Sequence, residues 1–150
     1  MNHQLQDSDF DQRVRASFAR QAFMATLGAR IVSVAPGDVV LELPFNQALT
    51  QQHGFLHAGV LAALADNACG FAALSLMPPG AAVMSVEFKI NLMAPAAGTL
   101  FRAAGRVIRA GRTLTVCSAE VIATNGDQEK VVAVMQATMM SVQNRPGLSD

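Results

Sequence analysis

The chain lacks tryptophan and tyrosine, and only two of its 11 basic residues are lysine. Stacking on nucleic acid bases would therefore depend on phenylalanine alone. The 11 acidic residues balance the basic ones and give a formal net charge of zero. This balance favours neither nucleic acid nor an anionic membrane as a partner, and we predict neither.

Cysteine is equally scarce. Cys69 and Cys117 both lie in apolar stretches, and the sequence contains no CxxC or Cys/His spacing. This pattern is typical of buried free thiols in a reducing compartment. Residues 1–11 are polar and acidic, so we expect no secretory signal and a cytoplasmic location. The three histidines make no convincing metal set, and we expect no metal or other cofactor.

The 150 residues are 51% hydrophobic and only 15% charged, with no internal repeat or linker. We predict a single domain over residues 1–150, with a core of about 20–142. Residues 1–9 and 143–150 are polar and are expected to form a flexible arm and tail. The high apolar content favours contacts between subunits, either in a dimer or in a tetramer.

Residues 58–77 have the length of a membrane span but carry a single charge, Asp66, near their middle. They are rich in alanine and glycine rather than leucine and isoleucine. We therefore expect a helix that is buried on most sides within the protein.

Shorter elements surround this long helix. A helix is expected over 10–21 and a further apolar turn over 23–27. Six strands are expected over 29–35, 39–45, 82–92, 99–109, 113–124 and 130–142. In the run 85–92, strict alternation places Val86, Phe88, Ile90 and Leu92 on one face. The order predicts an α+β fold in which an antiparallel sheet is wrapped around the long central helix.

The loop before the long helix and the helix itself contain the densest motif, QQHGFLHAGVLAALADN over residues 51–67. It resembles the PaaI-like thioesterases of the hot-dog superfamily. Their signature is His-Gly-Gly at the helix start, a carboxylate nine residues after the His, and an amide in the preceding loop. His57, Gly59 and Asp66 match it, Ala58 replaces the first Gly, and Gln51 matches the loop amide, with Gln52 as an alternative.

The resemblance implies a hot-dog fold and hydrolysis of a fatty or aryl acyl-CoA to free acid and CoA. It implies that the backbone N–H groups of Ala58 and Gly59 bind the thioester oxygen, and that Ser85 on the next strand helps to hold the site. Asn67, beside Asp66, is a further candidate substrate contact. Two equivalent sites across the two-fold axis of a homodimer are also implied.

Physical arguments support these assignments. N–H groups at a helix N-terminus stabilise the charge that develops on a thioester carbonyl. A carboxylate in an apolar helix is costly unless it is used, and Asp66 can act as general base or as nucleophile. Nine residues of helix rise about 13 Å, so His57 and Asp66 reach one carbonyl only if they come from two subunits.

Simpler roles are open for each of these residues. Asp66 could only hydrogen-bond a neighbouring helix, His57 could only cap its own helix, and Gln51 could be an ordinary loop residue. For the whole protein, the alternatives are a hot-dog hydratase or dehydratase, and a non-catalytic module that binds acyl-CoA.

Arginines gather between residues 102 and 112, a stretch without acidic residues. Phosphates favour such clusters, and the turn Arg109-Ala110-Gly111-Arg112 resembles the place where relatives hold the nucleotide of CoA. Arg109, Gly111 and Arg112 are therefore candidate contacts for CoA. The alternative is a solvated strand edge that discourages aggregation.

Overall fold

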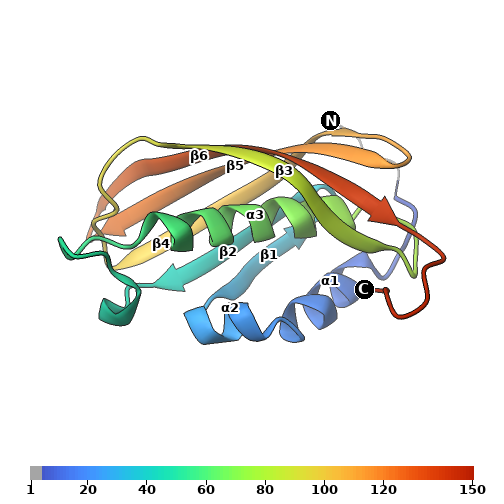
Figure 1. Ribbon diagram of the computed structural model, residues 1–150, viewed down its shortest axis with the longest axis horizontal. Coiled ribbons are helices and arrows are strands. Elements are labelled where there is room, and N and C mark those ends of the chain that lie inside the picture. Colours follow the sequence, from blue (N-terminus) through green and yellow to red (C-terminus); the bar gives the residue numbers. More distant parts are fainter. Residues whose placement is uncertain (1–4) are drawn as a thin grey trace.

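The computed structural model describes residues 5–150. One antiparallel sheet of six strands curves around a central helix, α3 (Figure 1). The strands follow the spatial order β1-β2-β4-β5-β6-β3. Their bounds are β1 Arg30–Ala35, β2 Asp38–Pro44, β3 Ala82–Leu92, β4 Leu100–Ala110, β5 Leu114–Asn125 and β6 Gln128–Val142. The predicted α+β architecture is confirmed.

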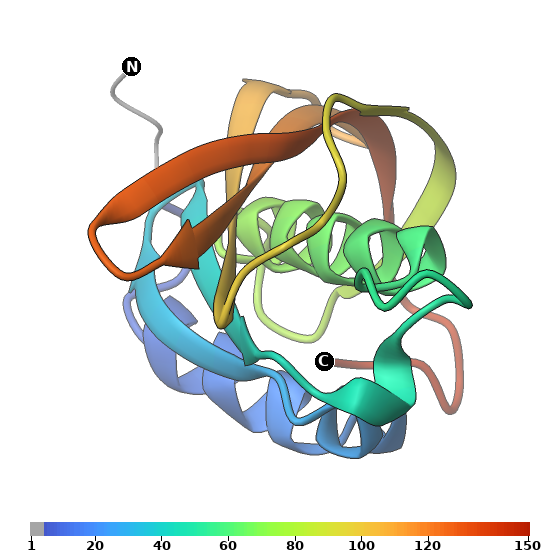
Figure 2. The same ribbon diagram turned by 90° about the vertical axis from the view of Figure 1, so that its left-hand side faces the viewer.

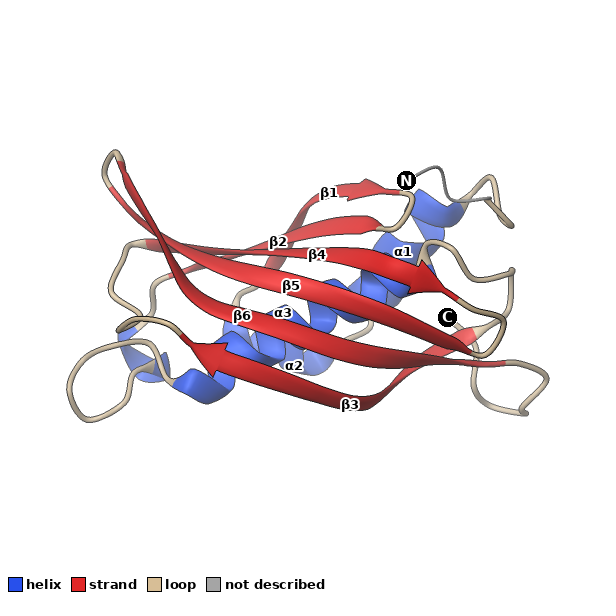
Figure 3. Ribbon diagram, turned by 90° about the horizontal axis from the view of Figure 1, so that it is seen from above, coloured by secondary structure: helices blue, strands red, loops and turns tan. Residues whose placement is uncertain are grey.

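The helices are α1 Phe10–Ala19, α2 Ala22–Leu27, the 3-10 turn η1 Gln47–Leu49, and α3 Ala58–Leu74. The sheet curls over α3, while α1 and α2 run beneath it (Figure 2). Seen from above, the six strands lie in front of the helices (Figure 3). The long helix ends three residues before the predicted position 77, ahead of Pro78 and Pro79.

Helix α3 fits closely against the inner face of the sheet. Alternate residues of β4 are buried there, among them Phe101 and Ala103. A Cβ on Gly105 would lie 2.3 Å from the backbone carbon of Ala68 on α3. This position on β4 therefore has to be glycine for the helix to approach so closely.

The arm and tail that we expected to be loose are tied to the domain where the structure describes them. Asp7 forms an ion pair of 2.9 Å with Arg13 of α1. At the other end, the Asp150 carboxylate accepts hydrogen bonds from Ser17 Oγ at 2.7 Å and from the Val83 backbone N–H at 2.8 Å. Residues 1–4 of the expected arm lie outside the described residues.

Strand β3 forms one edge of the sheet and leaves large apolar side chains in solvent. Met84, Val86, Phe88 and Leu92 of the strand, and Met93 directly after it, are each between 44% and 61% exposed. An exposed apolar edge strand is an aggregation hazard unless another chain covers it. Within residues 5–150, no helix has both the length and the apolar character needed to cross a membrane.

Candidate active site

Asp66 and Ser85 meet on the inner side of the sheet. The Ser85 hydroxyl of β3 donates a 2.7 Å hydrogen bond to Oδ1 of Asp66 on α3. Burial raises the pKa of Asp66 above its ordinary value, and the Ser85 hydrogen bond lowers it by a smaller amount. A carboxylate with a raised pKa is a stronger base, so this pair is suited to taking a proton near neutral pH.

A β-bulge directs Ser85 toward the helix. The register between β3 and β6 shifts between Ser85 and Glu87, which leaves Val86 as the extra residue. Ser85 pairs with Met139 and Phe88 with Ala137, and both partners are buried on the helix side. The bulge therefore gives Ser85 the place beside Phe88 on the helix side, which strict alternation would assign to Val86.

His57 caps the N-terminus of α3. Its Nδ1 accepts a 2.9 Å hydrogen bond from the backbone N–H of Gly59. We expected the Gly59 N–H to bind the thioester oxygen, but in the structure it already donates to His57. No described residue accepts a hydrogen bond from the Ala58 N–H. This N–H at the helix start can therefore donate to a substrate oxygen.

The two candidate loop amides differ in position. Gln51 is half-buried and lines an apolar cavity of about 320 Å³ together with Phe55, Ala58 and Leu92. Its Oε1 accepts a hydrogen bond from the His53 backbone N–H. Gln52 is exposed, and its side chain lies 3.3 Å from the His53 ring. Only Gln51 therefore adjoins the helix start.

A second and smaller cavity, of about 80 Å³, lies beside Asp66. Its lining includes Asp66, Asn67, Ser85 and Gln21, but neither Gln51 nor Ala58. One chain thus brings Asp66, Asn67 and Ser85 together and keeps them apart from the other predicted site residues. Gln21 was missed from the sequence because it lies between two short helices, outside any motif.

The predicted CoA contacts lie in the hairpin that joins β4 to β5. Arg109 and Arg112 are exposed there, and the Gly111 N–H donates to the Leu114 carbonyl at 2.9 Å. A Cβ on Gly111 would lie 2.6 Å from that same oxygen. Glycine is therefore required by the close approach of the two hairpin arms.

Arg102 does not belong with the exposed arginines of the hairpin. It forms an ion pair of 2.7 Å with Glu42 of β2, which Arg30 also contacts at 3.1 Å. The Arg102 hydrogen bond is the main reason why the pKa of Glu42 lies below its ordinary value. The stretch without acidic residues in the sequence is thus partly neutralised across the sheet.

Both cysteines are buried and free, as predicted. Burial raises the pKa of Cys117 to about 12 and raises that of Cys69 as well. Thiols that stay protonated are poor nucleophiles, so neither cysteine is suited to attack a thioester.

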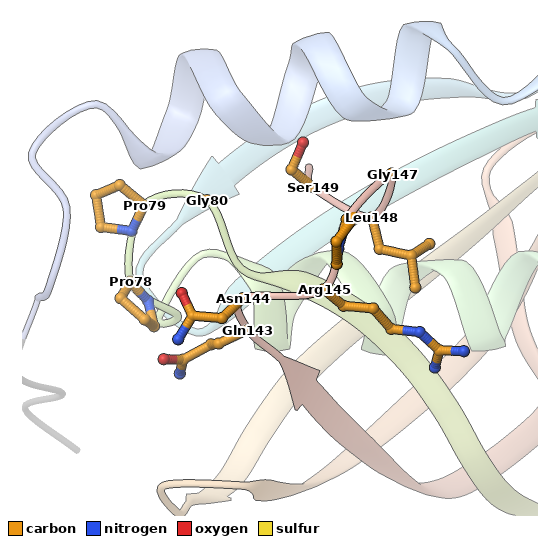
Figure 4. Close-up of a pocket in the computed structure, with 10 residues that line it drawn as sticks. Pro78, Pro79, Gly80, Gln143, Asn144, Arg145, Gly147, Leu148 and Ser149 are labelled. Carbon is orange, nitrogen blue, oxygen red and sulfur yellow. The ribbon is translucent and has the colours of Figure 1, made fainter.

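Another cavity, of about 460 Å³, lies between the Pro78–Gly80 turn and residues 143–149 (Figure 4). Its polar side chains include Arg145, Gln143 and Asn144. None of the residues predicted from the sequence lines it. The chemistry of the candidate site is therefore concentrated at α3 and β3.

Comparisons with known proteins show the family of this chain. Residues 53–130 match the thioesterase superfamily. A solved thioesterase family protein from Silicibacter pomeroyi is 51% identical, with a TM-score of 0.89 over 90% of this chain and 99% of that one. The PaaI protein of E. coli, from the phenylacetic acid degradation operon, is 25% identical, with a TM-score of 0.81 over 96% and 98% of the two chains. Human acyl-coenzyme A thioesterase 13 is 33% identical over 80% of this chain and 85% of its own length.

Proposed function

Since the chain belongs to the thioesterase superfamily and is a PaaI-like thioester hydrolase, we propose that it hydrolyses a fatty or aryl acyl-CoA with Asp66 as the reacting carboxylate. The observation that carries this proposal is the hydrogen bond between the exposed Ser85 and the half-buried Asp66. It joins a basic carboxylate to a hydroxyl that fixes one of its two oxygens. The name of the human relative gives acyl-CoA as its substrate, and we propose the same class of substrate for this chain.

The active site takes residues from two subunits. Asp66 and the Ala58 N–H are about two turns of helix apart, roughly 12 Å, and they adjoin separate cavities. A single thioester carbonyl cannot contact two groups that lie so far apart. A second copy of the chain supplies the missing helix start, and the exposed apolar edge of β3 offers a surface on which the copies can pair.

At this composite site the Ala58 N–H stabilises the oxyanion that forms as the thioester is attacked. The helix N-terminus adds its positive partial charge. Gln51 supports the bound thioester from the loop, and the apolar cavity beside it accommodates the first part of the acyl group. Arg109 and Arg112 bind the phosphates of CoA. The buried free thiols suit the reducing cytoplasm, where acyl-CoA is found.

The first test is release of CoA from a panel of fatty and aryl acyl-CoA substrates. We expect steady-state turnover of at least one of them. Tight binding without release of CoA would instead identify a non-catalytic binding module. Conversion of an enoyl-CoA without release of CoA would identify a hydratase.

Mixed dimers test the shared site. Gln51→Ala and Asp66→Ala chains are purified separately, mixed, and allowed to exchange subunits. If each site uses Asp66 from one chain and Gln51 from its partner, a mixed dimer has one intact site and regains activity. If each site lies within one chain, every site keeps a defect and mixing restores nothing, which would overturn the two-subunit arrangement.

A further inference from the structure

An acceptor without a partner lies next to the reacting carboxylate. Asn67 Nδ2 donates to the Ala63 carbonyl at 3.1 Å, whereas its Oδ1 is buried and receives no hydrogen bond from any described residue. A buried acceptor of this kind costs free energy unless a donor reaches it. Asn67 therefore needs a donor that the described chain does not provide.

The cavity beside Asp66 has the right size for such a donor to be water. Its volume is about 80 Å³, and one water needs roughly 10–15 Å³ of such space. Pockets for larger ligands start at about 300 Å³, so neither a fatty chain nor an aryl ring fits. The polar side chains around the cavity, Asp66, Asn67, Ser85 and Gln21, supply the several partners that a buried water requires.

On the basis of the proposed function, we infer that Asn67 holds the hydrolytic water in this cavity beside Asp66. Water in this cavity is already beside Asp66 when the thioester binds. A water that donates one hydrogen to Asn67 Oδ1 and the other to Asp66 has its lone pairs free for attack.

The reaction then balances without any further reagent. The water oxygen forms a bond to the thioester carbonyl carbon while Asp66 takes one proton from the water. The Ser85 hydroxyl occupies Oδ1, so Oδ2 receives that proton. The tetrahedral intermediate collapses, the C–S bond breaks, and sulfur leaves with the electron pair. Asp66 returns the proton to the CoA thiolate, and the products are the free acid and CoA.

Substitution of Asn67 separates this role from a contact with substrate. Leucine has a similar size and favours helix, but it has no acceptor. We expect Asn67→Leu to lower kcat at least about tenfold and to leave KM nearly unchanged, because Asn67 positions water and not acyl-CoA. Asn67→Ser keeps an oxygen and should retain more activity than Asn67→Leu. Asn125→Leu, on the exposed β5–β6 hairpin, is the matched control and should behave as wild type.

A normal kcat for a folded, dimeric Asn67→Leu would overturn the inference, as would an effect on KM alone. If Asp66→Asn is inactive in the same assay, the proposed function still stands. If Asn67→Leu does not fold, the inference is tested by comparing kcat of Asn67→Ser with kcat of wild type.

An isotope experiment on the wild-type enzyme tests the same inference without any substitution. With enzyme in excess over acyl-CoA in H₂¹⁸O, direct attack by water places one ¹⁸O in the acid of the first turnover. Acid that carries only ¹⁶O would show that an oxygen of Asp66 was transferred. That result would overturn the role of the Asn67 water and would leave Asp66 as the reacting carboxylate.

Discussion

The Ser85 hydroxyl lies 2.7 Å from Oδ1 of Asp66, although the two residues are 19 positions apart in the chain and belong to a strand and a helix. The contact exists because Val86 is the extra residue of a bulge in β3. Without it, the alternation of side chains would turn Ser85 away from the helix. The geometry of the reacting carboxylate therefore depends on one irregularity of the sheet.

This contact predicts the pH dependence of activity. The reaction needs ionised Asp66, so kcat/KM should fall on acidification with a midpoint above the ordinary aspartate pKa of 3.8, because burial raises the pKa of Asp66. Ser85→Ala removes the hydrogen bond that lowers this pKa, and the midpoint should move to higher pH. A pH profile of Ser85→Ala that coincides with wild type would contradict this role for Ser85.

The same burial predicts that Asp66 opposes folding at neutral pH. A pKa raised in the folded state means that the contribution of Asp66 to stability is present below its unfolded pKa and lost as pH rises through the folded one. Asp66→Asn stays neutral, so its Tm should exceed that of wild type at neutral pH, and the difference should shrink in acid. Asp127→Asn, at an exposed turn, is the control. A difference in Tm that grows on acidification would contradict the prediction that ionised Asp66 destabilises the folded protein.

Close packing of the sheet on α3 gives a prediction about stability. Gly105→Ala places a Cβ 2.3 Å from the Ala68 backbone and should lower the free energy of unfolding by about 1–3 kcal/mol. Gly70→Ala is the matched control within α3, where a Cβ meets no atom within 4 Å. It should stabilise the protein by about 0.5–1 kcal/mol through helix propensity. Urea unfolding at one protein concentration measures both changes, and equal stability of the two variants would contradict the packing.

The hairpin arginines predict an effect on binding of the nucleotide. A charge-assisted contact to phosphate contributes about 1.5–3 kcal/mol, so Arg112→Ala should raise KM for acyl-CoA about tenfold to a hundredfold. A truncated thioester without the nucleotide should show no change. Arg15→Ala, whose side chain pairs only with Asp11 among the described residues, is the control. An equal effect of Arg112→Ala on both substrates would contradict a contact with the nucleotide. It would favour the alternative that these arginines only form a solvated strand edge.

Much of the fold could be predicted from the sequence, because the turn residues and apolar runs mark each element. Strand β3 agrees with its predicted bounds at both ends, and the others differ by one or two residues. The bulge at Val86 could not be predicted, since alternation of apolar residues continues through it. The ties of Asp7 and Asp150 to the domain also depend on contacts that a polar composition does not reveal.

The site was predicted in part. The motif identified the positions of Asp66, His57 and Ala58, and the helical rise predicted that Asp66 and His57 lie far apart within one chain. Spacing alone could not show that the His57 ring accepts a hydrogen bond from the Gly59 N–H, because this contact depends on the rotamer of the His57 side chain. The nearness of Gln21 to Asp66, and an Asn67 Oδ1 that has no partner among the described residues, appear only when the start of α2, α3 and β3 are brought together in space.

The role of Asp66 is tested most directly by the turnover of Asp66→Asn with an acyl-CoA that the wild-type enzyme hydrolyses. Asparagine has almost the same shape but can neither accept the proton nor attack the thioester. We predict that kcat falls at least about a hundredfold, while sedimentation and circular dichroism show a folded oligomer like wild type. Near-normal release of CoA by folded Asp66→Asn would contradict the assignment of Asp66 as the residue that drives hydrolysis.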